Sequence, residues 1–416
     1  MRVGGMRICK IWDGDYPWDV RVEKVATALA GAGHELHLVC RNQARRQRQE
    51  WDQGFMIHRL QTLPAVFGPA NTLWNFPYPF NPAWIRVITQ VTRETKADLI
   101  LVRDLPVALT AAIVGKAYGI PVVLDMAENY PAMLRDRLRY VPTGLLGRLV
   151  RSPALARFVE RVTVRLVDHI LVVIEESRER LIQLGVPPGR LTVVRNTPKL
   201  DQVRVVRDLS FSPNTEAGTT LVYLGNLDGG RGLDVAIRAV RLLADGGVLT
   251  RLLIIGDGPD MQQYRDLASR LAVSARVIFQ GRSPLSTALA MVARCDIGVI
   301  PQYVSAHTDS TVSNKLFDYM LAGLPVIASS ARPTARIVRS EECGEIFLDR
   351  DVTDLARCIR ALQDPQRRRD KGLRGQAAIH ERYNWSCDSR TLVQTLEEVG
   401  SRRKAGLARA IQPSGS

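Results

Sequence analysis

The feature that most constrains the fold is a repeated alternation of short apolar runs with longer segments of helical periodicity. The apolar run at residues 7–12 is followed by a polar loop, by apolar residues at helical spacing over 22–30, and by a second apolar run at 35–40. The pattern recurs between residues 98 and 124. Strand–helix–strand units of this kind join parallel strands, so their repetition predicts a parallel sheet covered by helices.

A second series of such units begins near residue 220, after a stretch at 198–217 that lacks sustained apolar periodicity. The 416 residues are enough for two domains with separate cores. We therefore expect an α/β protein of two tandem, Rossmann-like, doubly wound parallel-sheet domains, with ligands at the carboxyl ends of the strands in a cleft between the domains. The expected organisation is an N-terminal domain at 1–200, a linker at 201–217, a second domain at 218–380, a last helix at 381–400, and a basic, disordered tail at 401–416.

The charge balance predicts a polyanionic partner. The formal net charge is +15 and the sequence pI is about 9.9, which favours nucleic acid, an anionic membrane or a charged substrate. Residues 135–165 carry eight arginines among Leu, Val and Phe, a pattern that fits a helix on an anionic membrane surface or, alternatively, a solvated helix face. Since no nucleic-acid recognition module is recognisable and no apolar run is long enough to span a bilayer, we expect a cytoplasmic protein peripheral to the inner face of the membrane.

Loops suited to a phosphorylated ligand follow several strands of the second series. Glycines occur in the loops at 225–232, 256–258 and 280–282, and glycine lets the backbone approach a diphosphate. The segment 313–329, SNKLFDYMLAGLPVIAS, predicts a helix that begins near Lys315 and runs into a buried strand. A lysine in the first helical turn is unfavourable unless an anion lies in front of it. Each loop alone could be an ordinary turn, but all four would open on one edge of a parallel sheet.

Three segments in this order carry a family resemblance: YLGNLDGGRGLDVAIRAV, IIGDGP and SNKLFDYMLAGLPVIAS. They resemble the donor-binding half of the GT-B glycosyltransferases, specifically the large retaining family 4. The N-terminal segments DYPWDVRVEKVATALAGAGHELHLV and RDLPVALTAAIVGKAYGIPVVLDMAENYP are similar to the acceptor-side domain of that family. The segment YNWSCDSRTLVQTLEEV resembles the final helix of that family, which implies that the helix at 381–400 crosses back to the first domain. The resemblance covers roughly residues 6–400 and is uninformative about the sugar.

The resemblance implies roles for individual residues of the second half. Arg231 would bind the donor diphosphate, Asp318 the nucleotide ribose, and Lys315 would neutralise the diphosphate as it leaves. Glycine at position 14, expected in the loop after the first strand, would let the first domain approach the donor phosphates. The implied donor-binding residues are Gly14, Gly225, Asn226, Arg231, Gly256, Asp257, Gly258, Arg282, Ser310, Thr311, Val312, Ser313, Asn314, Lys315 and Asp318.

Three positions depart from the family pattern. Ser310 replaces the first acid of the E-x7-E motif, Asn226 replaces a second diphosphate-binding arginine, and Ala127 replaces a histidine. Glu128 is a candidate for orienting the acceptor or acting as a general base, or it binds nearby backbone N–H groups as a structural carboxylate. The acceptor-side candidates are Arg103, Asp104, Asp125, Glu128 and Asn129, and the candidate catalytic residues are Glu128, Arg231 and Lys315.

The resulting expectation is a metal-independent retaining glycosyltransferase without a cofactor. It would move a sugar from a nucleotide-diphosphate-sugar donor to a hydroxyl of a lipid-linked or cell-envelope glycan. Two alternatives stay open: a catalytically weak nucleotide-sugar-binding partner of another transferase, and a GT-B-fold nucleotide-sugar epimerase. Nothing in the sequence indicates the oligomeric state.

Overall fold

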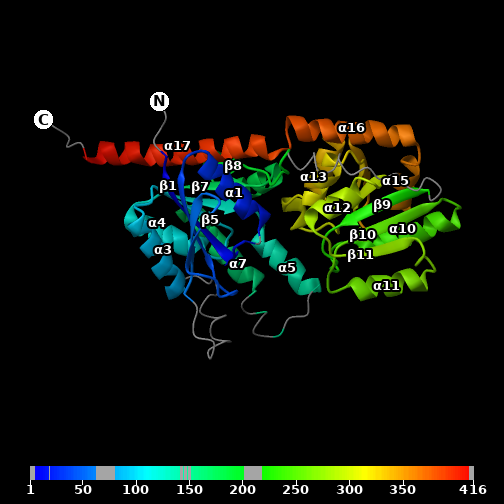
Figure 1. Ribbon diagram of the computed structural model, residues 1–416, viewed down its shortest axis with the longest axis horizontal. Helices are drawn as coiled ribbons and strands as arrows, with labels where there is room; N and C mark the ends of the chain where they lie inside the picture. The colour runs from blue at the N-terminus through cyan, green and yellow to red at the C-terminus, as the bar shows by residue number, and fades with distance from the viewer. Residues whose placement is uncertain are drawn as a thin grey trace. The chain divides into compact units, whose positions relative to one another are not determined.

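The computed structural model describes residues 5–17, 19–61, 80–140, 144, 148, 151–200 and 218–411, with side chains up to residue 402. The chain divides into two compact units. Unit 1 draws on residues 1–131, 151–194 and 389–416, and unit 2 on residues 132–150 and 195–388. Each unit contains one sheet (Figure 1).

Unit 1 is built on an eight-stranded sheet in the order β3-β4-β2-β1-β5-β6-β7-β8, and all of its strand pairs are parallel except β3–β4. Its strands are β1 (Arg7–Asp15), β2 (Glu35–Arg41), β3 (Gln49–Asp52), β4 (Phe55–Arg59), β5 (Leu99–Arg103), β6 (Val122–Met126), β7 (His169–Val172) and β8 (Leu191–Val193). Its helices are α1 (Val20–Gly31), α3 (Pro82–Glu94), α4 (Ala108–Tyr118), α7 (Pro153–Leu166), α8 (Glu175–Gln183) and the 3₁₀ turn η2 (Pro188–Arg190).

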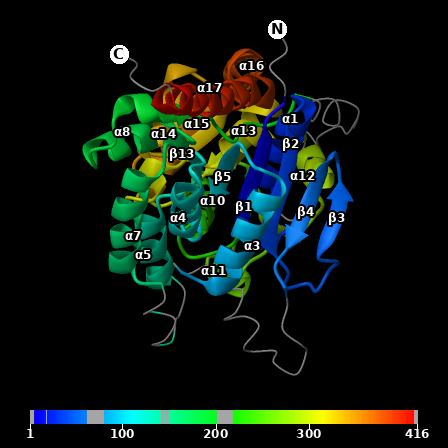
Figure 2. The same ribbon diagram turned by 90° about the vertical axis from the view of Figure 1, so that its left-hand side faces the viewer.

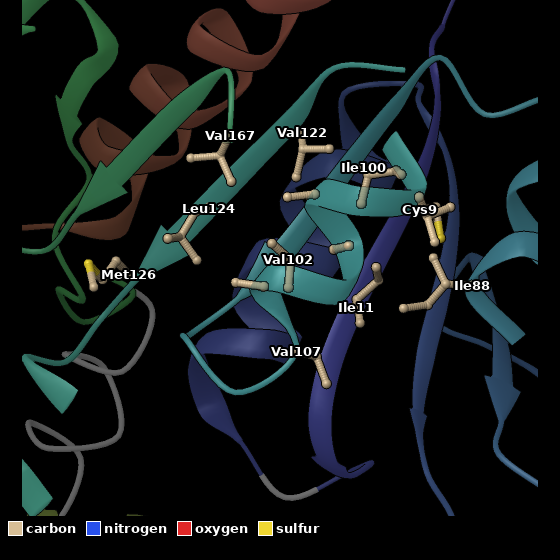
Figure 3. Close-up of a cluster of buried hydrophobic side chains, with 14 of the residues drawn as sticks. Cys9, Ile11, Ile88, Ile100, Val102, Val107, Val122, Leu124, Met126 and Val167 are labelled. Carbon is tan, nitrogen blue, oxygen red and sulfur yellow. The ribbon is translucent and has the colours of Figure 1, made fainter. Parts of the chain in front are cut away.

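The core of unit 1 lies on one face of this sheet. Cys9 and Ile11 of β1, Ile100 and Val102 of β5, and Leu124 of β6 project from alternate strand positions into one buried cluster (Figure 3). Side chains of α3 and α4 pack against them. The intervening strand positions face the other way, and several of them carry charged side chains that form a polar layer.

Unit 2 has a six-stranded, fully parallel sheet in the order β11-β10-β9-β12-β13-β14. Its strands are β9 (Thr219–Leu224), β10 (Thr250–Ile255), β11 (Val277–Gly281), β12 (Ile297–Ile300), β13 (Val326–Ser329) and β14 (Gly344–Phe347). Its helices are α10 (Leu233–Asp245), α11 (Met261–Arg270), α12 (Leu285–Val292), η4 (Thr308–Ser310), α13 (Asn314–Leu321), α14 (Arg332–Ser340), α15 (Val352–Ala361) and α16 (Pro365–Glu381). Two helices pass from one unit to the other: α5 (Tyr130–Tyr140) and α17 (Trp385–Ile411).

Two parallel, helix-covered sheets confirm the predicted fold class. The structure adds the β3–β4 hairpin, whose antiparallel β3 forms one edge of the first sheet (Figure 2). Gly14 was wrongly expected in a loop, because β1 continues to Asp15 after a register shift and encloses it. A Cβ atom at Gly14 would lie 2.3 Å from Cζ2 of Trp12, so a larger residue here would displace the Trp12 ring.

Other expected segments lie partly or wholly outside the described residues. The linker at 201–217 is outside them. Within the arginine-containing stretch at 135–165, residues 141–143, 145–147 and 149–150 are also outside them. Of the tail expected to be disordered, residues 401–411 continue helix α17, and residues 412–416 are outside the described range.

Candidate functional site

The glycine loops of unit 2 lie side by side at the carboxyl edge of its sheet. The N–H of Gly225, after β9, donates to the carbonyl of Ile255 at 2.9 Å, and the N–H of Gly256, after β10, donates to the carbonyl of Gly281 at 2.9 Å. Gly225 and Gly256 have φ values of 136° and 146°, a backbone conformation that favours glycine. A Cβ atom at Gly256 would lie 1.9 Å from the carbonyl oxygen of Gly225. The sequence therefore places glycine where two loops meet backbone to backbone.

The side chain of Lys315 lies directly over Gly225. A Cβ atom at Gly225 would be 2.6 Å from Cε and 2.7 Å from Nζ of Lys315. The Nζ atom also lies 5.0 Å from the centre of the Tyr223 ring, within the range of a cation–π interaction. The lysine on the first turn of α13 is thus directed at the first glycine loop, and glycine at 225 leaves room for it.

The electrostatic environment of Lys315 disfavours the charged form of its ammonium group. Burial of its ammonium group and the positive charge of Arg231 lower its pKa to about 7, although Asp318 and Asp228 act in the opposite direction. A dianionic ligand beside the ammonium group would favour its charged form. The site therefore holds a cation that is only partly protonated at neutral pH and that an anion would stabilise.

Arg231 belongs to the same loop, but it is already paired with an acid. Its Nε lies 3.1 Å from Oδ2 of Asp228, and its backbone N–H donates to the Asp228 carbonyl at 3.0 Å. Asp228 also accepts from the side-chain amide of Asn226 at 2.7 Å. Asp228 thereby organises the loop, and a diphosphate would have to compete with it for the guanidinium of Arg231. The sequence interpretation missed Asp228, which the Asp-x-x-Arg spacing could have indicated.

The residues before α13 differ in what they expose. Ser313 is the N-cap, with extended φ and ψ of −70° and 125°, and Thr311 is also extended. Val312 is buried. The hydroxyl of Ser310 donates to the carbonyl of Ala306 at 2.7 Å and is buried in the turn. The Ser310 side chain thus forms its hydrogen bond within the loop. Asn314, in contrast, is exposed, and Asp318 is partly exposed.

The remaining donor-side candidates lie at the outer part of this edge. Asn226, Asp257 and Arg282 are exposed. One Asp257 carboxylate oxygen accepts from the N–H of Gly258 at 2.8 Å. A Cβ atom at Gly258 would lie 2.3 Å from the carbonyl oxygen of Leu227, so this glycine too allows a close approach of two loops. The structure thus brings the predicted glycines together with Lys315 and leaves Arg282 exposed to solvent.

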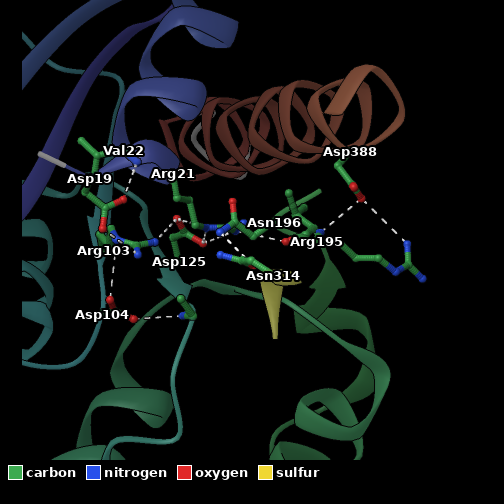
Figure 4. Close-up of polar contacts among 12 residues, drawn as sticks. Asp19, Arg21, Val22, Arg103, Asp104, Asp125, Arg195, Asn196, Asn314 and Asp388 are labelled. Carbon is green, nitrogen blue, oxygen red and sulfur yellow. Dashed lines mark hydrogen bonds and ion pairs between the residues drawn. The ribbon is translucent and has the colours of Figure 1, made fainter. Parts of the chain in front are cut away.

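At the carboxyl edge of unit 1, buried ion pairs connect β5, β6 and α1 (Figure 4). Nη2 of Arg21 lies 2.6 Å from Oδ1 of Asp125, and both side chains are almost completely buried, at 1% and 0% exposure. Burial alone would raise the pKa of Asp125, but the charges of Arg21, Arg103 and Lys10 outweigh it and lower the pKa to about 2. Asp125, predicted as an acceptor-side residue, is therefore a buried counterion.

Asp104 connects this network to the loop after β6. Its Oδ1 accepts from the N–H of Ala127 at 2.9 Å, which fixes the backbone beside Glu128. Burial raises the pKa of Asp104 to about 6, against the effect of Arg103. Its φ of 59° lies in the left-handed region, which is sparsely populated by residues other than glycine and often marks functional sites. Of the adjacent candidates, Asn129 is buried and Glu128 is partly exposed.

Lys10 is the most unusual member of the network, and the sequence interpretation missed it. It is completely buried on β1, and its Nζ has no hydrogen-bond partner among the described residues. Burial lowers its pKa to about 8, although the charge of Asp125 opposes this shift. A lysine inside the apolar run RICKIW was the available signal, as was Asp125 inside VVLDM. Both lie on the strand face opposite the apolar core.

Comparisons with known proteins agree with this architecture. Residues 19–197 match the model of the glycosyl transferase 4-like domain, and residues 218–364 match glycosyl transferases group 1. Glycogen synthase of Mycobacterium tuberculosis is 23% identical over 380 residues, which are 88% of this chain and 86% of that protein.

Solved structures share the fold over nearly the whole chain. Sucrose-phosphate synthase from Thermosynechococcus elongatus superposes with a TM-score of 0.74 at 18% identity, covering 95% of this chain and all of that one. HepE from Anabaena, in complex with UDP and glucose, gives a TM-score of 0.68 at 15% identity and covers 94% and 100% of the two chains. Together the two family models cover every strand of the second sheet and every strand of the first except β1. The chain therefore belongs to the group 1, family 4-like glycosyltransferases of GT-B fold, enzymes that transfer a sugar from a nucleotide-sugar donor.

Proposed function

We propose that the protein is a retaining glycosyltransferase that uses a nucleotide-diphosphate-sugar to glycosylate a hydroxyl of a lipid-linked or cell-envelope glycan. The observation that carries the donor part is the position of Lys315 over Gly225, beside Arg231 and at the start of α13. Two cations and the free N–H groups of a helix N-terminus suit a diphosphate. The adjacent glycines give its oxygens access to the backbone.

In the proposed reaction, the bond between the sugar C1 and the phosphate oxygen breaks while a bond from C1 to the acceptor oxygen forms. The acceptor proton passes to the leaving phosphate oxygen on the same face of the sugar. Lys315 and Arg231 stabilise the charge that develops on the diphosphate, which is electrostatic catalysis by preorganised groups. Asp318 binds the ribose hydroxyls. On unit 1, Glu128 orients the acceptor hydroxyl, on a loop that Asp104 fixes.

The proposed membrane contact rests on the exposed face of α7. Leu155 and Phe158 are 50% and 65% exposed, and Arg157, Arg161 and Arg165 lie exposed on the same helix. An apolar pair among arginines suits the interface of an anionic bilayer. Among the described helices, none combines the length and the apolarity needed to cross a bilayer. In liposome co-sedimentation, Phe158→Asp should abolish binding to anionic vesicles, whereas Leu373→Asp, at another exposed apolar residue, should not.

The donor assignment is tested by calorimetric titration of UDP, GDP and ADP against the wild type and Arg231→Ala. UDP comes first, because the related HepE structure holds it. We expect one diphosphate to bind selectively and Arg231→Ala to weaken it by about tenfold or more. If no diphosphate binds, the donor site is wrongly placed. Transfer to a lipid-linked acceptor with retained anomeric configuration, followed by NMR, would establish the reaction, and inverted product would refute retention.

A further inference from the structure

A pocket of about 400 Å³ opens in unit 1 away from the carboxyl-edge residues described above. It lies between the β3–β4 hairpin and helix α3, whose positions are seen in Figure 2. Gln49 and His58 face each other across the hairpin, and Val87, Gln90 and Val91 come from α3. The volume is within the range of sites for small organic ligands. None of the proposed donor or acceptor residues lines it.

A chain of hydrogen bonds through Glu35, His37 and His58 determines which nitrogen of His58 can accept a hydrogen bond in the pocket. Nε2 of His37 lies 2.9 Å from a carboxylate oxygen of Glu35, and Nδ1 of His37 lies 3.0 Å from Nε2 of His58. A carboxylate only accepts, so Nε2 of His37 is the donor in the first contact. The side-chain amide nitrogen of Gln49 only donates, so Nδ1 of His58 accepts from it, and the proton of the His58 ring lies on Nε2, which donates to Nδ1 of His37.

It follows that Nδ1 of His58 is an acceptor. His58 is 8% exposed, and burial together with His37 lowers its pKa to about 4, which keeps the ring neutral near pH 7. The contact of Nδ1 within the protein is a long one, 3.5 Å to the amide nitrogen of Gln49, at the outer limit of a hydrogen bond. A hydroxyl of a ligand would make a shorter and better-aligned bond to this nitrogen.

The rest of the lining complements a polyhydroxylated molecule. Gln49 and Gln90 carry amides that both donate and accept, and Arg48 adds a donor. Arg59 also lines the pocket, but its charge is balanced by Glu50, whose carboxylate lies 2.7 Å from Nη2 of Arg59. Val87 and Val91 supply an apolar wall, and Val91 is only 2% exposed. Alternating hydroxyl-binding groups and an apolar surface match the hydroxyl and C–H faces of a pyranose ring.

We propose that this pocket binds a neutral hexose unit of a glycan, at a site separate from the transfer reaction. His58 accepts a sugar hydroxyl, the amides of Gln49 and Gln90 bind neighbouring hydroxyls, and the two valines contact the ring. Such a site would hold the enzyme on its glycan between transfer events and would raise the effective concentration of acceptor.

The test is ligand-observed saturation-transfer NMR on the full chain, with the methyl α-glycosides of glucose, galactose and mannose as probes at millimolar concentration. Val87→Trp fills the pocket from a partly buried position on α3. The double variant Gln49→Ala/Gln90→Ala removes two exposed amides and leaves the core intact, so it remains informative if the tryptophan variant does not fold. Arg86→Ala is the matched control, because Arg86 is exposed on α3 and does not line the pocket.

We expect saturation transfer to at least one glycoside, loss of it in Val87→Trp, about tenfold weaker binding in the double alanine variant, and no change in Arg86→Ala. Absence of transfer to all three probes would overturn the proposal. Transfer that persists in both pocket variants would also overturn it, because the sugar would then bind elsewhere. Displacement of the glycoside by inorganic phosphate would show that Arg48 selects an anion, and it would refute a neutral-sugar site.

Discussion

Binding of a nucleotide diphosphate should draw a proton onto Lys315. In the free protein the pKa of Lys315 is lowered from 10.5 to about 7, first by burial and then by Arg231. A diphosphate placed against the ammonium group favours the charged form and raises this pKa again. At pH 8 only about a tenth of Lys315 is protonated before binding, so complete protonation on binding takes up about 0.9 proton per site.

The assay is calorimetric titration of UDP at pH 8 in buffers of different ionisation enthalpy. At this pH the terminal phosphate, with a second pKa near 6, is already deprotonated and contributes little proton exchange. The slope of the observed enthalpy against the buffer's ionisation enthalpy gives the number of protons taken up. If another diphosphate is the one that binds, the same titration is made with it.

Lys315→Met keeps the apolar stem over Tyr223 and removes the charge. We expect the slope to fall to about zero and the affinity to fall by about ten- to a hundredfold, the size of a lost charge-assisted hydrogen bond. Lys10→Met is the matched control, because it removes a second buried lysine of lowered pKa, in unit 1, and should keep the uptake. A wild-type slope near zero, or a slope unchanged by Lys315→Met, would refute the reasoning.

Three further predictions concern the two sheet edges. Gly225→Ala places a Cβ atom 2.6 Å from Cε of Lys315 and should weaken UDP by about tenfold with a folded core, and unchanged affinity in the calorimeter would contradict this. Asp125→Asn leaves Arg21 without its buried counterion and should cost about 3–5 kcal/mol in urea denaturation. A cost below 1 kcal/mol would show that the network relaxes. Folding lowers the pKa of Lys10 from 10.5 to about 8, so the unfolded chain binds more protons between these values and stability rises with pH there, by about 3 kcal/mol. Lys10→Met should abolish that rise, and a rise that persists in the variant would rule out Lys10 as its source.

The order of strands and helices could be predicted because it depends on local patterns. Apolar runs of strand length alternate with helical periodicity over most of the chain, and both parallel sheets follow from that alternation. The hairpin strand β3 was not foreseen, since QEWD is exposed and polar and has no period-2 pattern of apolar residues. Its pairing depends on β4, which lies nearby in sequence but carries the apolar residues of the pair.

The loops of the proposed donor site could also be located from sequence, because strand, glycine loop and helix start are consecutive in the chain. Parallel strands place all such loops on one edge, so their convergence follows from the order of elements. The partners of these residues were not accessible. The position of Lys315 over Gly225 joins residues 90 apart in the chain, and the pairing of Arg231 with Asp228 depends on the conformation of one loop.

The sequence by itself therefore determined the fold class, the family and the loops that carry the proposed donor site, since each of these depends on residues close together in the chain. Only the tertiary structure decided which charges meet in the interior. Lys10, Arg21, Arg103 and Asp125 come from three strands and a helix, and their charges act on one another because Arg21 of α1 pairs with Asp125 on the second face of the strands. The physical reason is that burial and charge pairing determine the charge states of Lys10 and Asp125. Both depend on packing between segments distant in the chain, and such packing leaves no periodic signal in the sequence.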